Sequence, residues 1–118
     1  GHTAGDDVLR GVGRSLGAPW LNGCFAARLG GDEFAVIIDD RYLTASPAWL
    51  RARLEESLCV PVAAGGLSLV SAGTVGIAAF NRDCRSIRDF VHLADTVLYT
   101  AKRARVGERR RGERRDAA

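Results

Sequence analysis

A double glycine followed at once by two acids interrupts an apolar region of the chain and constrains its fold more than any other feature. Residues Cys24–Leu29 are mostly apolar, and residues Phe34–Ile38 are rich in β-branched side chains, which β-strands favour. Glycine adopts positive φ angles without steric cost, so Gly30 and Gly31 suit a tight turn between two strands. The sequence therefore predicts a β-hairpin with these glycines at its turn.

Asp32 and Glu33 follow the glycines directly. Adjacent carboxylates repel each other, and a divalent cation or a proton relieves that repulsion. A solvated acidic turn explains the same two residues without any ligand. The residues by themselves leave a metal site and a plain surface turn both open.

The length of 118 residues indicates one domain or part of one. The chain begins at Gly1 and contains no Met, which suggests a fragment. It has no apolar stretch long enough for a membrane span and no secretory signal pattern at its start. Three scattered cysteines without a Cys-x-x-Cys pair favour neither disulfides nor zinc, and we expect thiols in a reducing cytoplasm.

The net charge of +3 is unevenly distributed. Residues 102–118 hold eight basic and three acidic side chains, a charge of +5, which leaves −2 for residues 1–101. We expect a folded domain over residues 1–105 and a basic, disordered tail over residues 106–118. Such a tail can contact nucleic acid or an acidic membrane surface, but we favour a solvated C-terminus and expect no nucleic-acid partner.

The start of the chain predicts a loop over Gly1–Asp7 that leads into a helix with Asp6 and Asp7 in its first turn. The apolar stripe of that helix consists of Val8, Leu9, Val12 and Leu16. A carboxylate such as Asp6 at a helix start is either a cap or an acceptor for the paired N–H donors of a guanine. His2 is assigned to the loop.

A second helix is predicted to start at Ser46 and Pro47 and to carry an apolar face made by Trp49, Leu50, Leu54 and Leu58. A turn at Gly65 and Gly66 then precedes a long strand over Leu67–Phe80. Gly73 and Gly76 within that strand indicate a bulge or a close backbone approach.

Ser86 and Asp89 form a predicted capping box for a last helix that reaches about Arg105. Its apolar face consists of Ile87, Phe90, Val91, Ala94, Leu98 and Ala101. Lys102, near the end, is explained on structural grounds as a surface lysine that compensates the helix dipole. Helices and strands in this order predict an α+β fold, with a mainly antiparallel sheet flanked by helices.

Three motifs then occur in one order. They are Gly1-His2-x-x-Gly5-Asp6-x-x-Leu9, Arg28-x-Gly30-Gly31-Asp32-Glu33-Phe34 and Ala94-Asp95-x-x-Leu98-Tyr99-x-Ala101-Lys102. Together they resemble the GGDEF family of diguanylate cyclases from Gly1 to about Arg105. Residues 71–78 are also similar to the central strand of that family.

The resemblance implies a fold like the palm of nucleotidyl cyclases and polymerases, with its first strand missing from this chain. It implies bacterial signalling by condensation of two GTP into cyclic di-GMP with release of two pyrophosphates. It further implies a homodimer with one GTP per domain, a divalent cation (Mg²⁺ or Mn²⁺), an N-terminal sensory or receiver domain and a cytoplasmic location.

The resemblance also assigns roles to residues. Asp32 becomes the metal ligand, and Glu33 becomes the second acid, which helps to orient or activate the 3′-hydroxyl. Gly30 and Gly31 let the turn approach the nucleotide. Asp6 matches the carboxylate that recognises guanine, and Lys102 matches the lysine that reaches the terminal phosphates.

Several positions depart from the family. The strand that supplies another metal-binding Asp, and an Asn that recognises guanine, would precede Gly1, so we expect this chain alone to be inactive. Many members of the family carry an Arg-x-x-Asp motif for product inhibition shortly before the glycine pair. The matching positions here are Leu21, Asn22, Gly23 and Cys24, so we expect no product inhibition through that site. An Ala104-Arg105-Val106-Gly107 run replaces the usual Gly-Arg, so an arginine contact to phosphate is lost or shifted to Arg105. A non-catalytic GTP-binding regulatory module is the alternative function.

Overall fold

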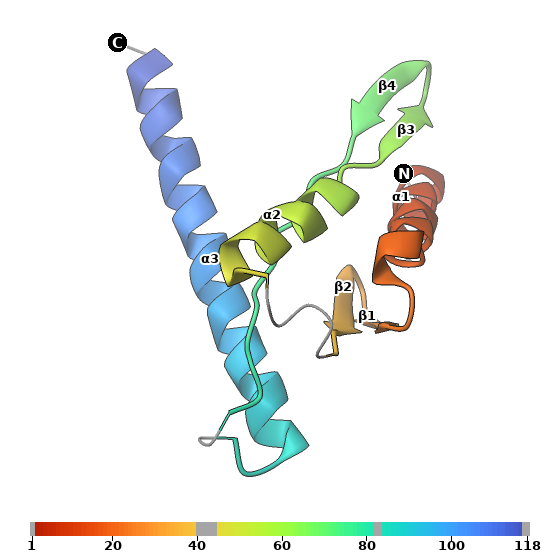
Figure 1. Ribbon diagram of the computed structural model, residues 1–118. Coiled ribbons are helices and arrows are strands. Elements are labelled where there is room, and N and C mark those ends of the chain that lie inside the picture. The colour runs from red at the N-terminus through yellow and green to blue at the C-terminus, as the bar shows by residue number, and fades with distance from the viewer. Residues whose placement is uncertain (1, 40–44, 82–83, 117–118) are drawn as a thin grey trace. The chain divides into compact units, whose positions relative to one another are not determined.

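The computed structural model describes residues 2–39, 45–81 and 84–116 (Figure 1). The chain divides into two compact units, an N-terminal unit from Gly1 to Gly73 and a C-terminal unit from Thr74 to Ala118. Short antiparallel strands and helices make up the described residues. The predicted α+β class is therefore confirmed.

The first helix, α1 (His2–Leu16), buries Val12 and Leu16 on one face. These residues are four positions apart, which places them on the same side of an α-helix. The chain then passes through a short 3₁₀ helix, η1 (Pro19–Leu21), whose Leu21 is also buried. The apolar stripe of the sequence thus predicts the buried face of α1.

The predicted start of α1 is wrong. Gly1 lies outside the described residues, but the helix already includes His2, which is therefore not part of a loop. Asp6 and Asp7 consequently lie beyond the first turn, which contains no acid. A single Gly5 weakens a helix by only about 1 kcal/mol, which is too little to stop one that packs along the rest of its length.

The predicted hairpin is confirmed, with strands β1 (Phe25–Gly30) and β2 (Glu33–Ile37) paired antiparallel. Gly30 pairs with Glu33, so the turn consists of Gly31 and Asp32. The turn is therefore one residue further along the chain than the two glycines predict.

The helix α2 (Pro47–Ser57) begins where its capping signal predicts. The Trp49 amide donates to the Ser46 hydroxyl oxygen at 3.0 Å, so Ser46 caps the helix. Leu50 and Leu54 are buried, but Trp49 is 51% exposed and does not share their face.

The strands β3 (Pro61–Ala64) and β4 (Leu67–Val70) form a second antiparallel hairpin with its turn at Gly65 and Gly66. The long strand predicted over Leu67–Phe80 is therefore wrong beyond Val70. No strand follows β4 in the part of the chain that the structure describes.

The side chain of Ser71 explains why the ladder ends there. Its hydroxyl oxygen accepts from the Val60 amide at 2.9 Å, where a backbone carbonyl would continue the ladder. The same hydroxyl donates to the Leu58 carbonyl at 2.7 Å. The Ser71 amide still donates to the Val60 carbonyl at 2.9 Å, so the hydroxyl replaces only the backbone acceptor at the end of this pair.

The core of the N-terminal unit lies where α1 packs against β3 and α2. Its buried apolar side chains are Val12, Leu16, Leu21, Leu50, Leu54, Val60 and Val62. The β1–β2 pair and the β3–β4 pair are two separate two-stranded sheets within the described residues.

The C-terminal unit is dominated by α3 (Ile87–Asp116). The predicted capping box is confirmed, because the Asp89 amide donates to the Ser86 hydroxyl oxygen at 3.1 Å. In return the Asp89 carboxylate accepts from the Arg85 amide at 3.0 Å. The helix therefore starts as its sequence predicts.

The predicted end of this helix near Arg105 is wrong, because α3 continues to Asp116. Residues 117 and 118 lie outside the described part. Arginine, alanine and glutamate favour helices, and Gly107 and Gly112 each weaken the helix by only about 1 kcal/mol. No proline follows to stop it. The division into domains stays a prediction.

An extended segment, residues 74–80, runs along α3 within the same unit (Figure 1). A methyl group added at Gly76 would lie 2.7 Å from the Cα atom of Leu98. Further along, the rings of Phe80 and Phe90 meet edge to face with centroids 5.5 Å apart. The close backbone approach predicted at Gly76 is thus confirmed, and its partner is a helix.

We expect Gly76→Ala to lower the free energy of unfolding by about 1–3 kcal/mol, because its methyl group would overlap the α3 backbone. Urea denaturation followed by circular dichroism measures this change. The matched control is Gly107→Ala in α3, where nothing lies within 4 Å of the added carbon. The control should keep or raise stability. Unchanged stability of Gly76→Ala would contradict the packing described.

Candidate functional site

The tip of the β1–β2 hairpin is held by two glycines in conformations that other residues rarely adopt. Gly30 has a φ of 154° and Gly31 has a φ of 52°. The Gly31 value is in the left-handed region, where an L side chain is strained. This conformation lets two residues reverse the chain, so the two acids stay at the tip.

A side chain on β1 stabilises this turn. On β1, Arg28 pairs with Phe34 and Gly30 pairs with Glu33, although Phe34 and Glu33 are consecutive residues of β2. The ladder is therefore irregular at Leu29. The Nε atom of Arg28 donates to the Gly31 carbonyl at 2.9 Å. In the sequence Arg28 is only one member of a motif, and no local pattern indicates this contact.

Both acids at the tip are exposed. Asp32 is part of the turn, and Glu33 is the first residue of β2. The cross-strand neighbour of Glu33 is Gly30, which has no side chain. A Cβ atom built on Gly30 or Gly31 would meet no described protein atom within 4 Å. A ligand can therefore approach the backbone and the two carboxylates together.

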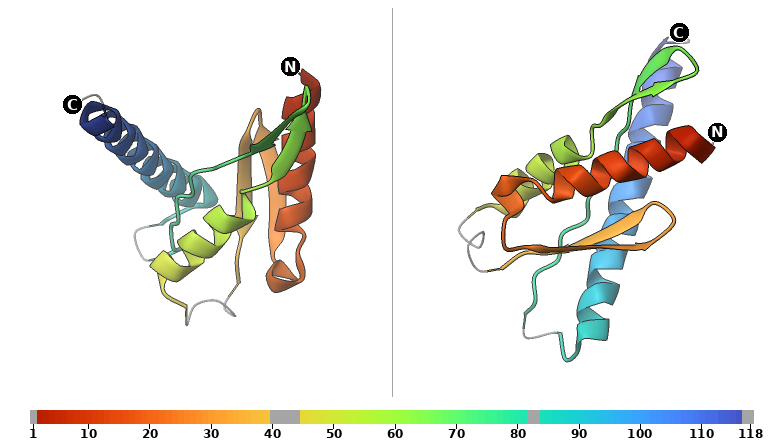
Figure 2. Two further views of the ribbon diagram at one scale, coloured as in Figure 1. Left: turned by 90° about the horizontal axis from the view of Figure 1, so that it is seen from above. Right: turned by 90° about the vertical axis from the view of Figure 1, so that its right-hand side faces the viewer.

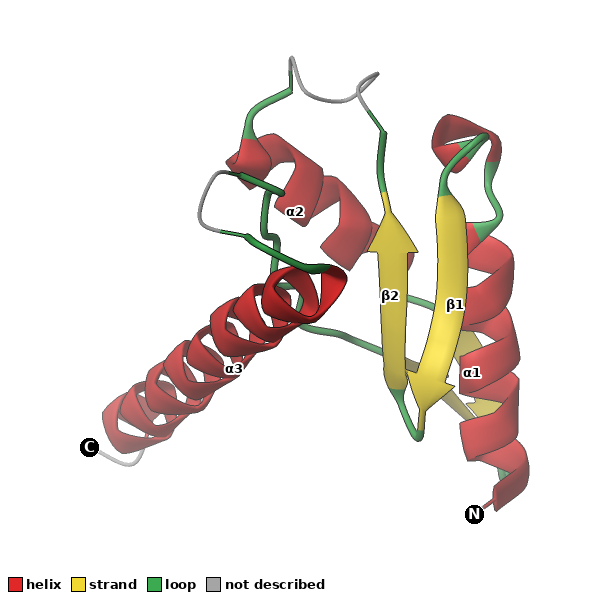
Figure 3. Ribbon diagram, turned by 90° about the horizontal axis from the view of Figure 1, so that it is seen from below, coloured by secondary structure: helices red, strands yellow, loops and turns green. Residues whose placement is uncertain are grey.

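Asp6 lies on the N-terminal half of α1 and is exposed. Both views of Figure 2, and the view from below in Figure 3, show the hairpin tip at the end of the N-terminal unit where α1 starts. The structure thus brings Asp6 and the Gly-Gly-Asp-Glu turn to one end of this unit.

Lys102 belongs to the C-terminal unit, where it is an exposed residue of α3. It follows Leu98 by four residues and precedes Arg105 by three, so the three share one side of the helix. Its ammonium group is available to an anion from solvent.

A hollow of about 250 Å³ in the N-terminal unit has a lining of its own. Asp7, Arg10 and Arg14 of α1 line it together with residues 61–63 of β3. The Asp7 carboxylate is 3.6 Å from the Arg10 guanidinium, so the charges in this hollow are partly paired. None of the predicted site residues lines it.

The two acids at the tip can hold part of a metal site. Carboxylate oxygens suit Mg²⁺, which protein sites often bind through one or two carboxylates, with water and substrate phosphates as the other ligands. No group of three or more His, Cys, Asp or Glu residues suited to a metal ion occurs among the described residues. Asp32 and Glu33 are therefore not part of a complete protein cage among the described residues.

Comparison with known families decides the assignment. The family described as "Diguanylate cyclase, GGDEF domain" matches residues 1–108, which include the hairpin, α1 and most of α3. The chain belongs to the GGDEF family. The resemblance drawn from the three sequence motifs is confirmed.

Relatives of this GGDEF domain include signalling proteins and cyclases. An uncharacterized signaling protein of Caulobacter vibrioides is 39% identical over 103 residues, 86% of this chain and 13% of the relative. Diguanylate cyclase TpbB of Pseudomonas aeruginosa is 33% identical over 117 residues, 98% of this chain and 27% of the relative. The chain therefore spans only a small part of the length of these relatives.

A solved structure shares both fold and sequence with the domain. It is the crystal structure of a sensory box/GGDEF family protein from Caulobacter crescentus CB15, with a TM-score of 0.68 and 37% identity. The match covers 88% of this chain and 67% of that one. In the part of the GGDEF domain that the structure describes, no helix has the length and apolar character needed to cross a membrane.

We expect Gly31→Ala to destabilise the hairpin tip by about 1–2 kcal/mol, because alanine is strained at a φ of 52°. Gly31→Asn is the matched control, since asparagine tolerates this region better than other side chains. Amide hydrogen exchange at Asp32 and Glu33 measures the local opening. Equal exchange in both variants and the wild type would contradict a turn that depends on glycine.

Proposed function

We propose that this GGDEF domain is the catalytic domain of a diguanylate cyclase. In this reaction the 3′-oxygen of each GTP attacks the α-phosphorus of the other, and the bond to pyrophosphate breaks. Two such attacks give cyclic di-GMP and two pyrophosphates. The observation that carries the proposal is the intact acid pair on an exposed turn, Asp32 and Glu33, in a chain of this family.

The acid pair is proposed to hold a divalent cation, Mg²⁺ or Mn²⁺. When bound, such a cation lowers the pKa of the attacking hydroxyl and neutralises charge on the phosphates. Asp32 is assigned as its ligand. Glu33 is assigned as the second acid, which holds the cation and orients the 3′-hydroxyl. Their exposure leaves room for the waters that Mg²⁺ keeps in protein sites.

Gly30 and Gly31 are proposed to form the floor of the nucleotide site, since no side chain separates their backbone from a ligand. Asp6 is proposed to select guanine. Its carboxylate offers only acceptors, which match the two neighbouring N–H donors of a guanine edge. Asp6 lies on the N-terminal half of α1. The start of α1 and the hairpin tip lie at the same end of the N-terminal unit (Figure 3), which supports this role.

Lys102 is proposed to bind the terminal phosphates through its ammonium group. The long α3 that carries it starts at a confirmed capping box and packs along residues 74–80. A rigid helix of this kind fixes the backbone position of Lys102, which reduces the conformational entropy lost when the lysine binds a ligand.

The complete active unit is proposed to be a homodimer of palm-like domains, each of which holds one GTP. The relatives are much longer than this chain, and one similar structure is named a sensory box/GGDEF protein. A sensory or receiver domain on the N-terminal side is therefore proposed to control activity. The substrate GTP places the reaction in the cytoplasm.

We expect Asp32→Asn and Glu33→Gln, made in the full-length protein, each to lower kcat about 100-fold or more, because a charge that stabilises the transition state is removed. Pyrophosphate release from GTP and Mg²⁺ measures this rate. Glu56→Gln is the matched control, since Glu56 is exposed on α2 and its carboxylate forms an ion pair with Arg53 of the same helix at 3.6 Å. It should keep the wild-type rate.

A regulatory module without catalytic activity would give a different result. It would bind GTP saturably in calorimetry and release no pyrophosphate, with the acid pair intact. Full activity in either Asp32→Asn or Glu33→Gln would overturn the assignment of the acid pair.

A further inference from the structure

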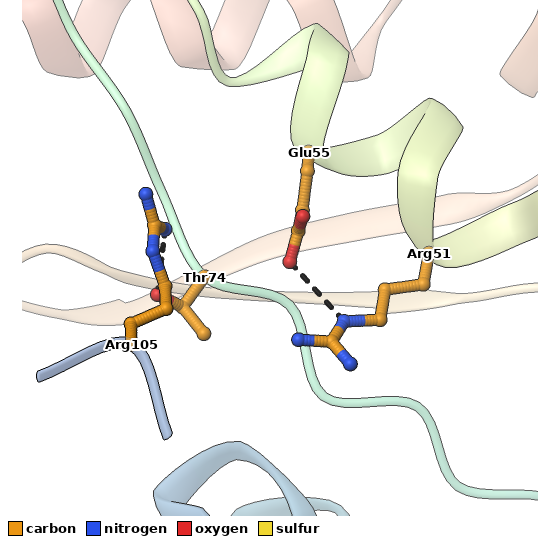
Figure 4. Close-up of polar contacts among 4 residues, drawn as sticks. All are labelled: Arg51, Glu55, Thr74 and Arg105. Atoms are coloured by element: carbon orange, nitrogen blue, oxygen red, sulfur yellow. Dashed lines mark hydrogen bonds and ion pairs between the residues drawn. The ribbon is translucent and has the colours of Figure 1, made fainter. Parts of the chain in front are cut away.

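The last turns of α3 extend past the segment that packs along this helix. Thr74 is the first residue of that segment and of the C-terminal unit, and its Oγ1 atom accepts from the Nη1 atom of Arg105 at 2.9 Å (Figure 4). Beyond this level, a Cβ atom built on Gly107 or Gly112 would meet no described protein atom within 4 Å. This end of the helix is therefore open to a partner.

The open end of α3 carries a dense cluster of positive charge. Residues 109–115 contain five arginines and one glutamate, a charge of +4. The side chains of Arg109, Arg110 and Arg111 are exposed. None of the three forms an ion pair with a side chain that the structure describes. The region that matches the GGDEF family ends at residue 108, so the cluster lies outside the part of the chain that the family defines.

The helix distributes these arginines around its axis. Successive residues of an α-helix are about 100° apart, so Arg109, Arg110 and Arg111 together span about 200° of the helix surface. A flat membrane surface meets only one side of a helix, and a helix that lies on it buries an apolar face. Residues 107–116 consist of Gly, Glu, Arg and Asp only. The cluster therefore fits an anionic surface that curves around the helix better than a flat one.

We propose that the end of α3 binds duplex DNA without sequence preference, through Arg109, Arg110 and Arg111. The major groove of B-form DNA admits an α-helix, and the phosphates of its two strands flank such a helix on both sides. Arginine binds phosphate oxygens through charge-assisted hydrogen bonds, and contacts to phosphates carry no sequence information. This interaction goes beyond the proposed cyclase function and does not depend on it. It replaces the expectation from the sequence that the chain has no nucleic-acid partner.

Fluorescence anisotropy with a labelled DNA duplex of random sequence tests this proposal in the full-length protein, without GTP. The variant Arg109→Gln/Arg110→Gln/Arg111→Gln should bind the duplex about tenfold more weakly, or weaker still, at low salt, because three phosphate contacts are lost. The slope of log K against log salt should become shallower by about two to three, since each contact contributes about 0.9. Glutamine favours helices about as well as arginine, so the variant keeps the helix.

The matched control removes the same charge elsewhere, as Arg10→Gln/Arg14→Gln/Arg51→Gln. These three arginines are exposed on α1 and α2. The Nε atom of Arg51 lies 3.2 Å from the Glu55 carboxylate (Figure 4), and an exposed ion pair of this kind contributes little to stability. The control should keep the affinity for the duplex and the salt slope of the wild type, because phosphate contacts and not net charge determine the slope.

Equal weakening in the two triple variants would show that net charge alone acts, and would overturn the proposal. A wild-type protein that does not bind the duplex at low salt would do the same. Vesicles of phosphatidylserine and phosphatidylcholine provide the flat anionic surface for comparison. If the wild type binds these vesicles more tightly than DNA, and loses that binding in the variant of Arg109, Arg110 and Arg111, the cluster belongs to a membrane surface and the proposal is wrong.

Discussion

The site depends on one backbone constraint, the left-handed conformation of Gly31. Its φ of 52° lets the chain reverse within Gly31 and Asp32, so Glu33 already pairs with Gly30 as the first residue of β2. A longer turn would let the two acids move independently. The bond from Arg28 to the Gly31 carbonyl holds the same turn from β1. A pair of exposed carboxylates is therefore presented on a short, ordered tip, which suits a cation shared with a ligand.

The parts of the fold that the sequence predicts well are those with strong local chemistry. The hairpin follows from a glycine pair between apolar runs, and α2 follows from Ser46 and Pro47, whose cap is present in the structure. The capping box at Ser86 and Asp89 likewise marks the start of α3. In each case a few neighbouring residues determine the conformation, so no knowledge of tertiary contacts is needed.

The sequence prediction is wrong where the structure depends on a contact between residues distant in the sequence, or where the local sequence signal is weak. The strand that starts at Leu67 ends at Val70, where the hydroxyl of the next residue, Ser71, bonds to the backbone of Val60 and Leu58 more than ten positions away. The predicted start of α1 and the predicted end of α3 are wrong because single glycines weaken a helix without ending it. The sequence motifs name the candidate residues, but the bond from Arg28 to the Gly31 carbonyl is visible only in the structure. Side-chain partners across a turn or between segments cannot be derived from spacing alone.

The central claim is that the hairpin tip holds the divalent cation, and paramagnetic broadening by Mn²⁺ tests it most directly. Isotope-labelled protein is titrated with Mn²⁺ in the presence of a non-hydrolysable GTP analogue, and the amide resonances are followed. The amides of Gly31, Asp32 and Glu33 should be among the first to broaden, and Asp32→Asn should weaken the effect. Broadening confined to other acids, with the hairpin tip unaffected, would contradict it.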